Sequence, residues 1–443
     1  MKKFGNHIRN FLNRPSAWLV ITVFALVVRG ILAWQLQDVP LSGDSLYYYQ
    51  VAENVASGES FSTYWSPGLP LYEAAVIKLF GAGEFKVRLA MLLWFLLLFR
   101  LVYKLLHRMH SRMAANIALL ILAFYPTFVY QSLEPLAQLP AATLLMALFF
   151  GTYRYLNGRR SWVWYIGLAL GLITMFHPSS ALFFLLVPAI IFLRSKKLLP
   201  VLLIVASGLA IVGPWIWMAS TTKRFVPVNE ANARNFYLGN NAWTPHYKTW
   251  YYGSHWTEAP EIPAAFQAEL DSLQANAEKN HSSTFLKAAF THLGRRPDLF
   301  LLRTANRSRV YFSFDSLTGS HFKPPPGPPQ AFAYSSMILN GLFFIGIGLT
   351  WLAFLMGASR FEVERRYLRL SYSFILLYTL PYLVSYAHPS FHLPIMPFFI
   401  LSTAMLLAKA LRNKSLEWRP GWKWGVIALL FLLVQLEWIL QMS

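Results

Sequence analysis

The first residues that could do chemistry lie in a polar stretch, 41–70, that follows an apolar first segment. Asp44 stands there shortly before three consecutive tyrosines, 47–49. Four acidic residues fall between positions 38 and 59 with no Lys or Arg among them, although the chain carries a formal net charge of +20. An ionisable group at the edge of a membrane is costly to place, so Asp44 is a candidate functional acid. The structural alternative is that Asp44 caps a helix starting at Ser45.

Aromatic side chains surround this acid in the sequence. Tyrosines 47–49 and Trp65 could form a wall for a sugar ring or an isoprenoid chain. Tyrosine and tryptophan also gather at membrane–water interfaces, which is the alternative for each of them.

Basic side chains that could meet an anionic ligand occur at three later places. His177 precedes Pro178, and His392 precedes Leu-Pro at the start of a late apolar run. Arg303 and Arg307 are four residues apart, so they share one face of a predicted helix, and guanidinium groups suit phosphate oxygens. The alternatives are a histidine that ends a helix before proline and arginines that attract anionic lipid headgroups.

The composition predicts the class of protein that positions these residues. Of 443 residues, 56% are hydrophobic and 13% are charged, against about 25% charged in soluble proteins, so the chain is predicted to be an integral membrane protein. The basic residues lie in short patches between apolar runs, which follows the positive-inside rule and argues against nucleic acid binding. The absence of cysteine excludes disulfides, cysteine metal sites and thiol catalysis.

No metal or cofactor is predicted, with a divalent ion as the alternative left open. The histidines of the later polar loop are scattered without metal-ligand spacing. They are His246, His255, His281, His292 and His321.

Eleven apolar runs have about the length that crosses a bilayer. They are 17–36, 85–103, 114–131, 136–156, 162–176, 178–193, 198–219, 331–356, 367–386, 393–411 and 423–440. The basic stretch 1–14 with the first run resembles a signal peptide, but its length favours a retained helix. The segment 69–80 is too short to span and contains Glu73 and Lys78, so it is predicted to lie in the interface as an amphipathic helix.

With eleven spans, every basic patch falls on one side, which predicts a cytoplasmic N-terminus and an outer C-terminus. The chain then divides into an N-terminal membrane domain (1–219), a large outer loop (220–330) and C-terminal membrane helices (331–443), with a first outer loop at 37–83. In the large loop we expect a turn at 235–241, a polar helix at 263–279, a cationic helix or helix pair at 284–313 and a polyproline spacer at 324–329. No P-loop is present, which argues against ATP-driven transport.

Several motifs, in this order along the chain, resemble the GT-C superfamily of lipid-linked sugar transferases, in particular its family 39-like branch. That branch includes the protein mannosyltransferases and the lipid A aminoarabinose transferase. The motifs are Asp44 with Tyr48, Ala52 and Gly58, the Pro-Gly-Leu-Pro at 67–70, Gly81 to Arg88, Pro214-Trp215, Tyr237 to Asn241, and Leu393-Pro394.

This resemblance implies an all-α GT-C fold with interfacial helices, and an inverting transfer of a sugar from polyprenyl phosphate to a hydroxyl outside a bacterial inner or plasma membrane. Asp44 would be the base, Tyr48 a substrate contact, and Arg303, Arg307, His177 and His392 the groups around the donor phosphate. Lys or Arg is usual where His392 stands, so the chain departs from the family there. The acceptor is open among lipid, glycan and protein.

Two other functions remain as alternatives. An O-antigen ligase or polymerase also has many spans and one large outer loop, with its key basic residues in that loop. A transporter or flippase of lipid-linked sugars would need buried charges within its spans, where Arg29 is the clearest candidate, followed by Gln138 and Glu437.

Overall fold

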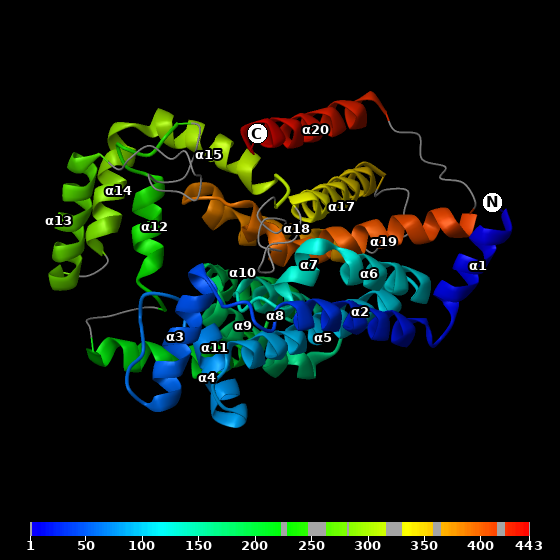
Figure 1. The fold of residues 1–443 in the computed structure, drawn as a ribbon, viewed down its shortest axis with the longest axis horizontal. Helices are drawn as coiled ribbons and strands as arrows, with labels where there is room; N and C mark the ends of the chain where they lie inside the picture. The colour runs from blue at the N-terminus through cyan, green and yellow to red at the C-terminus, as the bar shows by residue number, and fades with distance from the viewer. Residues whose placement is uncertain are drawn as a thin grey trace.

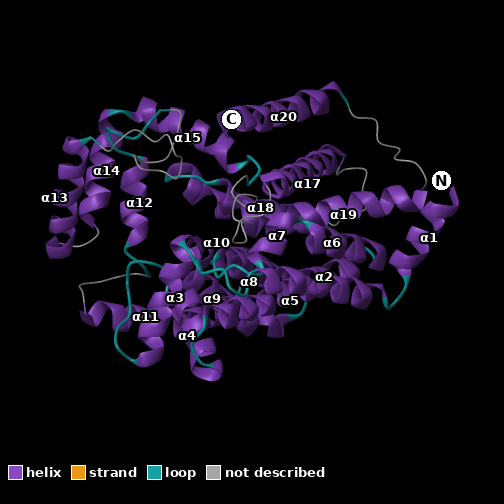
Figure 2. Cartoon of the chain, in the orientation of Figure 1, coloured by secondary structure: helices purple, strands orange, loops and turns teal. Residues whose placement is uncertain are grey.

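The structure, a computed structural model, describes residues 2–222, 228–246, 263–280, 283–315, 330–357, 365–413 and 421–442. Every regular element in these ranges is helical, as Figure 2 shows, which confirms the predicted all-α class. The polyproline segment and the histidines at 255, 281 and 321 fall outside the described residues.

Helices follow the apolar pattern closely. Up to residue 222 they are α1 (Lys2–Asn13), α2 (Ala17–Gln35), α3 (Gly43–Ser57), α4 (Gly68–Phe80), α5 (Glu84–Met109), α6 (Arg112–Phe124), α7 (Pro126–Gln131), α8 (Gln138–Leu156), η1 (Arg160–Trp162), α9 (Val163–Phe176), η2 (Pro178–Leu182), α10 (Phe183–Ser195) and α11 (Leu198–Thr222). After it they are α12 (Ala231–Gly239), α13 (Ala264–Asn280), α14 (Ser283–Arg295), α15 (Pro297–Tyr311), α17 (Gln330–Gly357), α18 (Arg365–Val384), η4 (Pro389–Ile395), α19 (Met396–Asn413) and α20 (Trp422–Met442). Each of the eleven predicted runs overlaps at least one of these helices.

Among the described residues, seven helices are long and apolar enough to cross a membrane. They are Ala17–Gln35, Glu84–Met109, Pro178–Ser195, Leu198–Thr221, Ser335–Gly357, Pro389–Arg412 and Trp422–Leu440. The run 114–131 is divided because Tyr125, which precedes Pro126, is extended with a ψ of 115°, as residues before proline usually are. The chain is therefore a multi-pass membrane protein, and the number of eleven spans stays a prediction.

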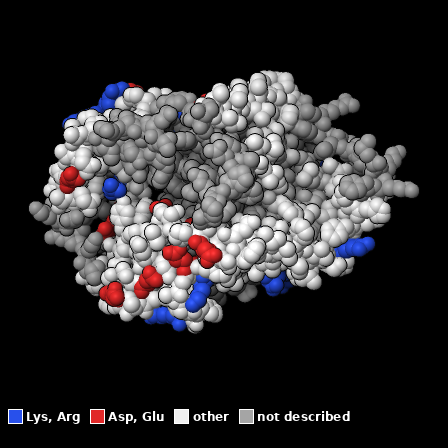
Figure 3. All heavy atoms as spheres, in the orientation of Figure 1, with Lys and Arg blue, Asp and Glu red and all other residues white. Residues whose placement is uncertain are grey.

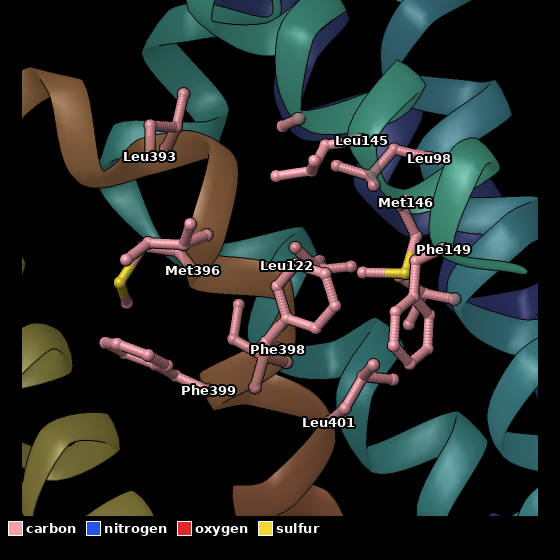
Figure 4. Packing of buried hydrophobic residues seen from close by; sticks show 14 of the residues in the cluster. Leu98, Leu122, Leu145, Met146, Phe149, Leu393, Met396, Phe398, Phe399 and Leu401 are labelled. Carbon is pink, nitrogen blue, oxygen red and sulfur yellow. The ribbon is translucent and has the colours of Figure 1, made fainter. Parts of the chain in front are cut away.

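The core lies where α5, α6, α8 and α19 meet. Figure 4 shows Leu98, Leu122, Met146, Phe149 and Phe398 packed together from these four helices. The candidate span Pro389–Arg412, made of η4 and most of α19, is 89% buried, whereas the span Trp422–Leu440 of α20 is only 17% buried. The helix α19 is therefore central and α20 lies at the periphery.

The polar helices of the second loop gather at one end of the molecule. Figure 1 shows α12, α13 and α14 at the end opposite α1 and the N-terminus. The predicted helix at 263–279 and the helix pair interrupted at Pro297 are both confirmed. The turn predicted at 235–241 is wrong over most of its length, because α12 continues to Gly239. The side chains of Asn240 and Asn241 donate to carbonyls of the last turn of α12, which satisfies that helix end.

Candidate functional site

Asp44 lies in the first turn of α3, which begins at Gly43 after the N-cap residue Ser42. Gly43 has a φ of +58°, a conformation that glycine adopts without cost. The capping alternative, with a helix starting at Ser45, is therefore wrong. A carboxylate in a first turn is stabilised by the positive end of the helix dipole. The Asp44 side chain is exposed, so it is available to a substrate.

The start of α5 holds the segment that leads into α3. The Glu84 carboxylate accepts from the Leu41 amide at 2.6 Å, and Arg88 donates to the carbonyls of Val39 and Pro40 at 3.3 and 3.5 Å. These bonds fix the backbone three to five residues before Asp44. Glu84 and Arg88 are thus positioning residues for the predicted base.

The acidic residues between positions 38 and 59 lie at the surface of the protein. Asp38, Asp44 and Glu59 are exposed and Glu53 is half-buried. Figure 3 shows acidic side chains gathered over the part of the molecule where α3 lies in Figure 1. Lys or Arg side chains lie beside this acidic group in the same view, so the face carries charges of both signs.

The three tyrosines have different partners. Tyr48 is buried in the main core, and burial, with the nearby charges of Asp44 and Glu73, raises its pKa, so it stays protonated. The Tyr49 hydroxyl accepts from the Gly83 amide at 2.9 Å. The Tyr47 hydroxyl is 2.8 Å from the Ser62 hydroxyl. Tyr48 and Tyr49 are therefore buried within the protein, and Tyr47 faces a groove.

That groove is small and lies along α3, the helix that also carries Asp44. One wall is Tyr47, Val51 and Val55, spaced four residues apart, and Asp44 precedes Tyr47 by three residues on the same side of the helix. The other lining residues are Phe61, Ser62, Trp65, Ser66, Pro67, Pro70, Leu71 and Trp215. Among the residues that the structure describes, this lining is largely aromatic and aliphatic and contains no charged side chain.

A buried cluster of charges lies behind α3, and the sequence analysis missed it. Arg88 and Glu134 form an ion pair at 2.5 Å, and Glu73 of α4 is completely buried. Within the described part of the chain, neither carboxylate oxygen of Glu73 has a hydrogen-bond partner. Burial, with the charge of Glu134 nearby, raises the pKa of Glu73 well above its usual range, so we expect a neutral acid. An acidic residue in the mainly apolar segment 69–80 was the signal that could have identified it.

Replacing Glu73 by glutamine is expected to remove a pH dependence of stability. An acid whose folded pKa is raised holds its proton in the native state but loses it in the unfolded state above pH ~4.3. Stability then falls as pH rises towards the folded pKa, by up to about 1.4 kcal/mol per pH unit. In thermal melts of detergent-purified protein, Glu73→Gln should gain Tm over wild type at pH 8 and little at pH 4.5. Parallel pH curves for the two proteins would contradict the neutral acid.

His177 lies between α9 and η2, half-buried, and contacts α18. Its Nε2 is 2.8 Å from the hydroxyl of Tyr382, which is itself 3.3 Å from the hydroxyl of Tyr378. Burial lowers the pKa of His177 to about 4. At neutral pH the side chain is uncharged, so it can offer a substrate a hydrogen bond but no charge.

His392 is fully enclosed near the start of α19. Its Nδ1 is 2.8 Å from the carbonyl of Tyr311, and its ring lies 4.7 Å from that of Phe344. The rings of Tyr311 and Tyr382 stack at 5.6 Å, so one aromatic layer connects His392 with His177. The structure thus brings the two predicted histidines into one buried network.

Arg303 is 1% exposed and uses its donors on the protein. It donates to the carbonyl of Asn241 at 3.0 Å and to that of Thr244. Burial lowers its pKa to about 10, which leaves the guanidinium charged at neutral pH. Arg303 therefore holds the turn after α12.

Arg307 joins the outer loop to the membrane helices. It is fully buried and donates to the carbonyls of Gly239, Leu383 and Val384 and to the side-chain oxygen of Asn240. A Cβ on Gly239 would lie 1.8 Å from the carbonyl oxygen of Ser385, so only glycine permits this approach. In this structure both arginines are positioning residues, and their contact with a phosphate stays a prediction.

A metal site receives no support from the described part of the chain, where no group of three or more His, Asp or Glu side chains could hold an ion. Of the loop histidines, His246 is exposed and His292 lies 3.5 Å from Arg303.

The chain is similar to known proteins in sequence and in fold. Residues 66–218 match the family model "Dolichyl-phosphate-mannose-protein mannosyltransferase". The fold resembles that of ArnT from Cupriavidus metallidurans bound to undecaprenyl phosphate, with a TM-score of 0.52 and 17% identity, over 89% of this chain and 60% of ArnT. The archaeal oligosaccharyltransferase AglB from Archaeoglobus fulgidus, in complex with an inhibitory peptide and a dolichol-phosphate, matches with a TM-score of 0.43 and 16% identity over 95% of this chain and 55% of AglB. The chain thus spans less than two thirds of either protein. No curated protein sequence matches it.

Proposed function

We propose, from the premise that this chain belongs to the GT-C superfamily of membrane glycosyltransferases, that it moves a sugar from a polyprenyl-phosphate donor to an acceptor hydroxyl on the extracytoplasmic side of the membrane. The observation that carries the proposal is the exposed Asp44 carboxylate, fixed at the start of α3 beside an uncharged groove. The mannosyltransferase match over 66–218 and the ArnT-like fold support it.

The proposed reaction is a single inverting displacement. The acceptor oxygen attacks C1 of the sugar while the Asp44 carboxylate takes the hydroxyl proton. The bond between C1 and the phosphate oxygen breaks, and polyprenyl phosphate leaves with the electron pair.

The other predicted site residues take supporting roles. Tyr48 remains protonated, so we assign it to the support of α3 beside Asp44. We assign neutral His177 a hydrogen bond to the sugar donor rather than a charge interaction with it. We assign His392 to hold the aromatic layer that connects it with His177. Arg303 and Arg307 are assigned to hold the outer loop, since their donors already face carbonyls.

The contacts of the charged residues within the spans favour an enzyme over a flippase. Arg29 donates to the carbonyls of Ala25, Leu122 and Ala123 and lies 3.6 Å from the centre of the Phe95 ring, which is a fixed structural arrangement. Glu437 pairs with Arg309 of α15. A ligase with its key cations in the large loop is also less favoured, because Arg303 and Arg307 are enclosed.

The test uses the purified protein in nanodiscs with a panel of polyprenyl phosphates, each carrying one radiolabelled hexose or pentose, and total membrane extract as the acceptor source. We expect label to leave one of these donors and free polyprenyl phosphate to appear. A flippase would move the donor between leaflets of a vesicle without consuming it. Movement without consumption across the panel would contradict the proposed function.

A further inference from the structure

The peripheral helix α20 carries two polar side chains within a span that is otherwise largely apolar. Gln435 is 1% exposed and Glu437 is half-buried, although most of the span Trp422–Leu440 is exposed. Figure 1 shows α20 along the edge of the molecule, next to α17 and the end of α15. Polar groups inside a span are costly to place, so these two side chains are candidates for a function.

Both side chains contact the end of α15. The Gln435 side chain accepts from the amide of Phe314 at 3.0 Å and donates to the carbonyl of Phe312 at 2.9 Å. Glu437 forms an ion pair with Arg309. Backbone groups at the end of a helix have no partner within that helix, so Gln435 satisfies a carbonyl and an amide that follow α15 directly. Gln435 therefore holds the point at which α15 ends.

The helix α17 holds the same segment at its other end. The side chain of Asn340 donates to the carbonyl of Asp315 at 2.7 Å and accepts from the amide and the hydroxyl of Thr127 at 3.2 and 2.7 Å. Asn340 thus ties residue 315 to α7, whereas Gln435 holds the two residues nearest to Tyr311. Two membrane helices together set the position of this segment.

Tyr311, the last residue of α15, connects this segment to His177. Its ring stacks on that of Tyr382 with 5.6 Å between the centroids, and the Tyr382 hydroxyl is 2.8 Å from Nε2 of His177. The carbonyl of Tyr311 is 2.8 Å from Nδ1 of His392. The Tyr311 side chain is fully buried, and closely packed interiors leave little room for one ring to move without its neighbours. The position of the His177 imidazole therefore depends on where α15 ends.

We infer that Gln435 is a positioning residue for the contact between His177 and the sugar donor, and that it acts through Tyr311 and Tyr382. This inference rests on the proposed function, which assigns that contact to His177. It gives α20 a part in donor binding, although this helix lies at the periphery of the protein.

The first test needs no donor. Gln435→Leu removes both bonds to the end of α15 and leaves a side chain of similar size, and Leu436→Ala changes the exposed neighbouring position as the control. Wild type and both variants in nanodiscs are treated at neutral pH with diethyl pyrocarbonate, which modifies uncharged imidazole, and the adducts are quantified by mass spectrometry. The exposed His7 of α1 serves as the internal standard.

His177 should react severalfold faster in Gln435→Leu than in wild type, because its imidazole loses the bond to Tyr382 when the rings shift. Leu436→Ala should react like wild type at this position. An unchanged rate at His177 in Gln435→Leu would overturn the inference.

The second test uses the labelled donor that wild type consumes. Gln435→Leu should raise the KM for this donor about tenfold, roughly the effect of one hydrogen bond. The kcat at saturating donor should be unchanged, because a contact made equally before and during transfer affects KM alone.

The double variant Gln435→Leu/His177→Ala should have the same KM as His177→Ala, because a residue that acts through another has no further effect once that residue is removed. Multiplied losses in the double variant, or a lower kcat with an unchanged KM in Gln435→Leu, would overturn the inference. Wild type that consumes no donor would contradict the proposed function, while the reaction rates at His177 would still decide whether Gln435 positions it.

Discussion

Asp44→Asn is expected to lower the rate of sugar transfer by about 10²–10⁴-fold, the range that a positioned general base contributes. Asparagine has nearly the same shape but cannot accept the hydroxyl proton. The side chain is exposed in the first turn of α3, so the helix should form without its charge at a cost of about 1 kcal/mol at most. Donor affinity should remain, because the substitution removes a negative charge and no contact to a phosphate.

The acidic surface supplies the control for this prediction. Asp38→Asn and Glu59→Gln remove the same charge from exposed neighbouring positions. They should keep transfer within about twofold of wild type if Asp44 acts as a base, since surface changes of this kind are small. Equal losses in all three variants would instead assign the effect to the negative field of the whole surface.

Arg307→Ala should release the outer loop from the membrane helices. The substitution leaves the carbonyls of Gly239 and Val384 without their donor, and each unsatisfied buried acceptor costs about 1–3 kcal/mol. We expect a loss of about 3 kcal/mol or more in the stability of this contact. Amide hydrogen exchange should rise in 231–246 and in α15 before it rises in α19. Arg307→Lys should lose much of the same energy, because one ammonium group does not reproduce the guanidinium fork.

Arg295 of α14 offers the matched control. Its side chain is exposed, and Arg295→Ala should change stability by no more than about 0.5 kcal/mol. If Arg307→Ala left hydrogen exchange as unchanged as Arg295→Ala does, the positioning role of Arg307 would be refuted. If Arg307→Ala loses both sugar transfer and the hydrogen-exchange protection of the loop, the loop contributes to transfer through its geometry rather than by binding phosphate.

The helices could be predicted from the sequence because the length of each apolar run indicates whether a helix can cross the membrane. Of the four runs that miss the length or apolarity of a span, 162–176 is too short, and the other three contain prolines or polar residues whose partners are far away in sequence. Thr127 illustrates this, since it bonds Asn340 of α17 through both its amide and its hydroxyl. Such partners cannot be read from a local window.

The site was predictable only in part. Asp44 could be identified because it is an acidic residue in a polar stretch that follows an apolar segment. The spacing of Arg303 and Arg307 predicted that they share a helix face. It could not predict the carbonyls that this face contacts, since these acceptors lie some 60 to 77 residues away. Glu73, Arg88 and Glu134 were missed as a cluster because they come from three separate segments that only the fold brings together.

The most direct measurement of the central claim compares wild type with Asp44→Asn in nanodiscs, with both proteins saturated by the same radiolabelled sugar donor. Bound donor is quantified first, and release of polyprenyl phosphate is then followed over time in the presence of membrane extract. Equal occupancy with release only from wild type is the predicted result. Equal release by both proteins would contradict the claim that Asp44 is the base.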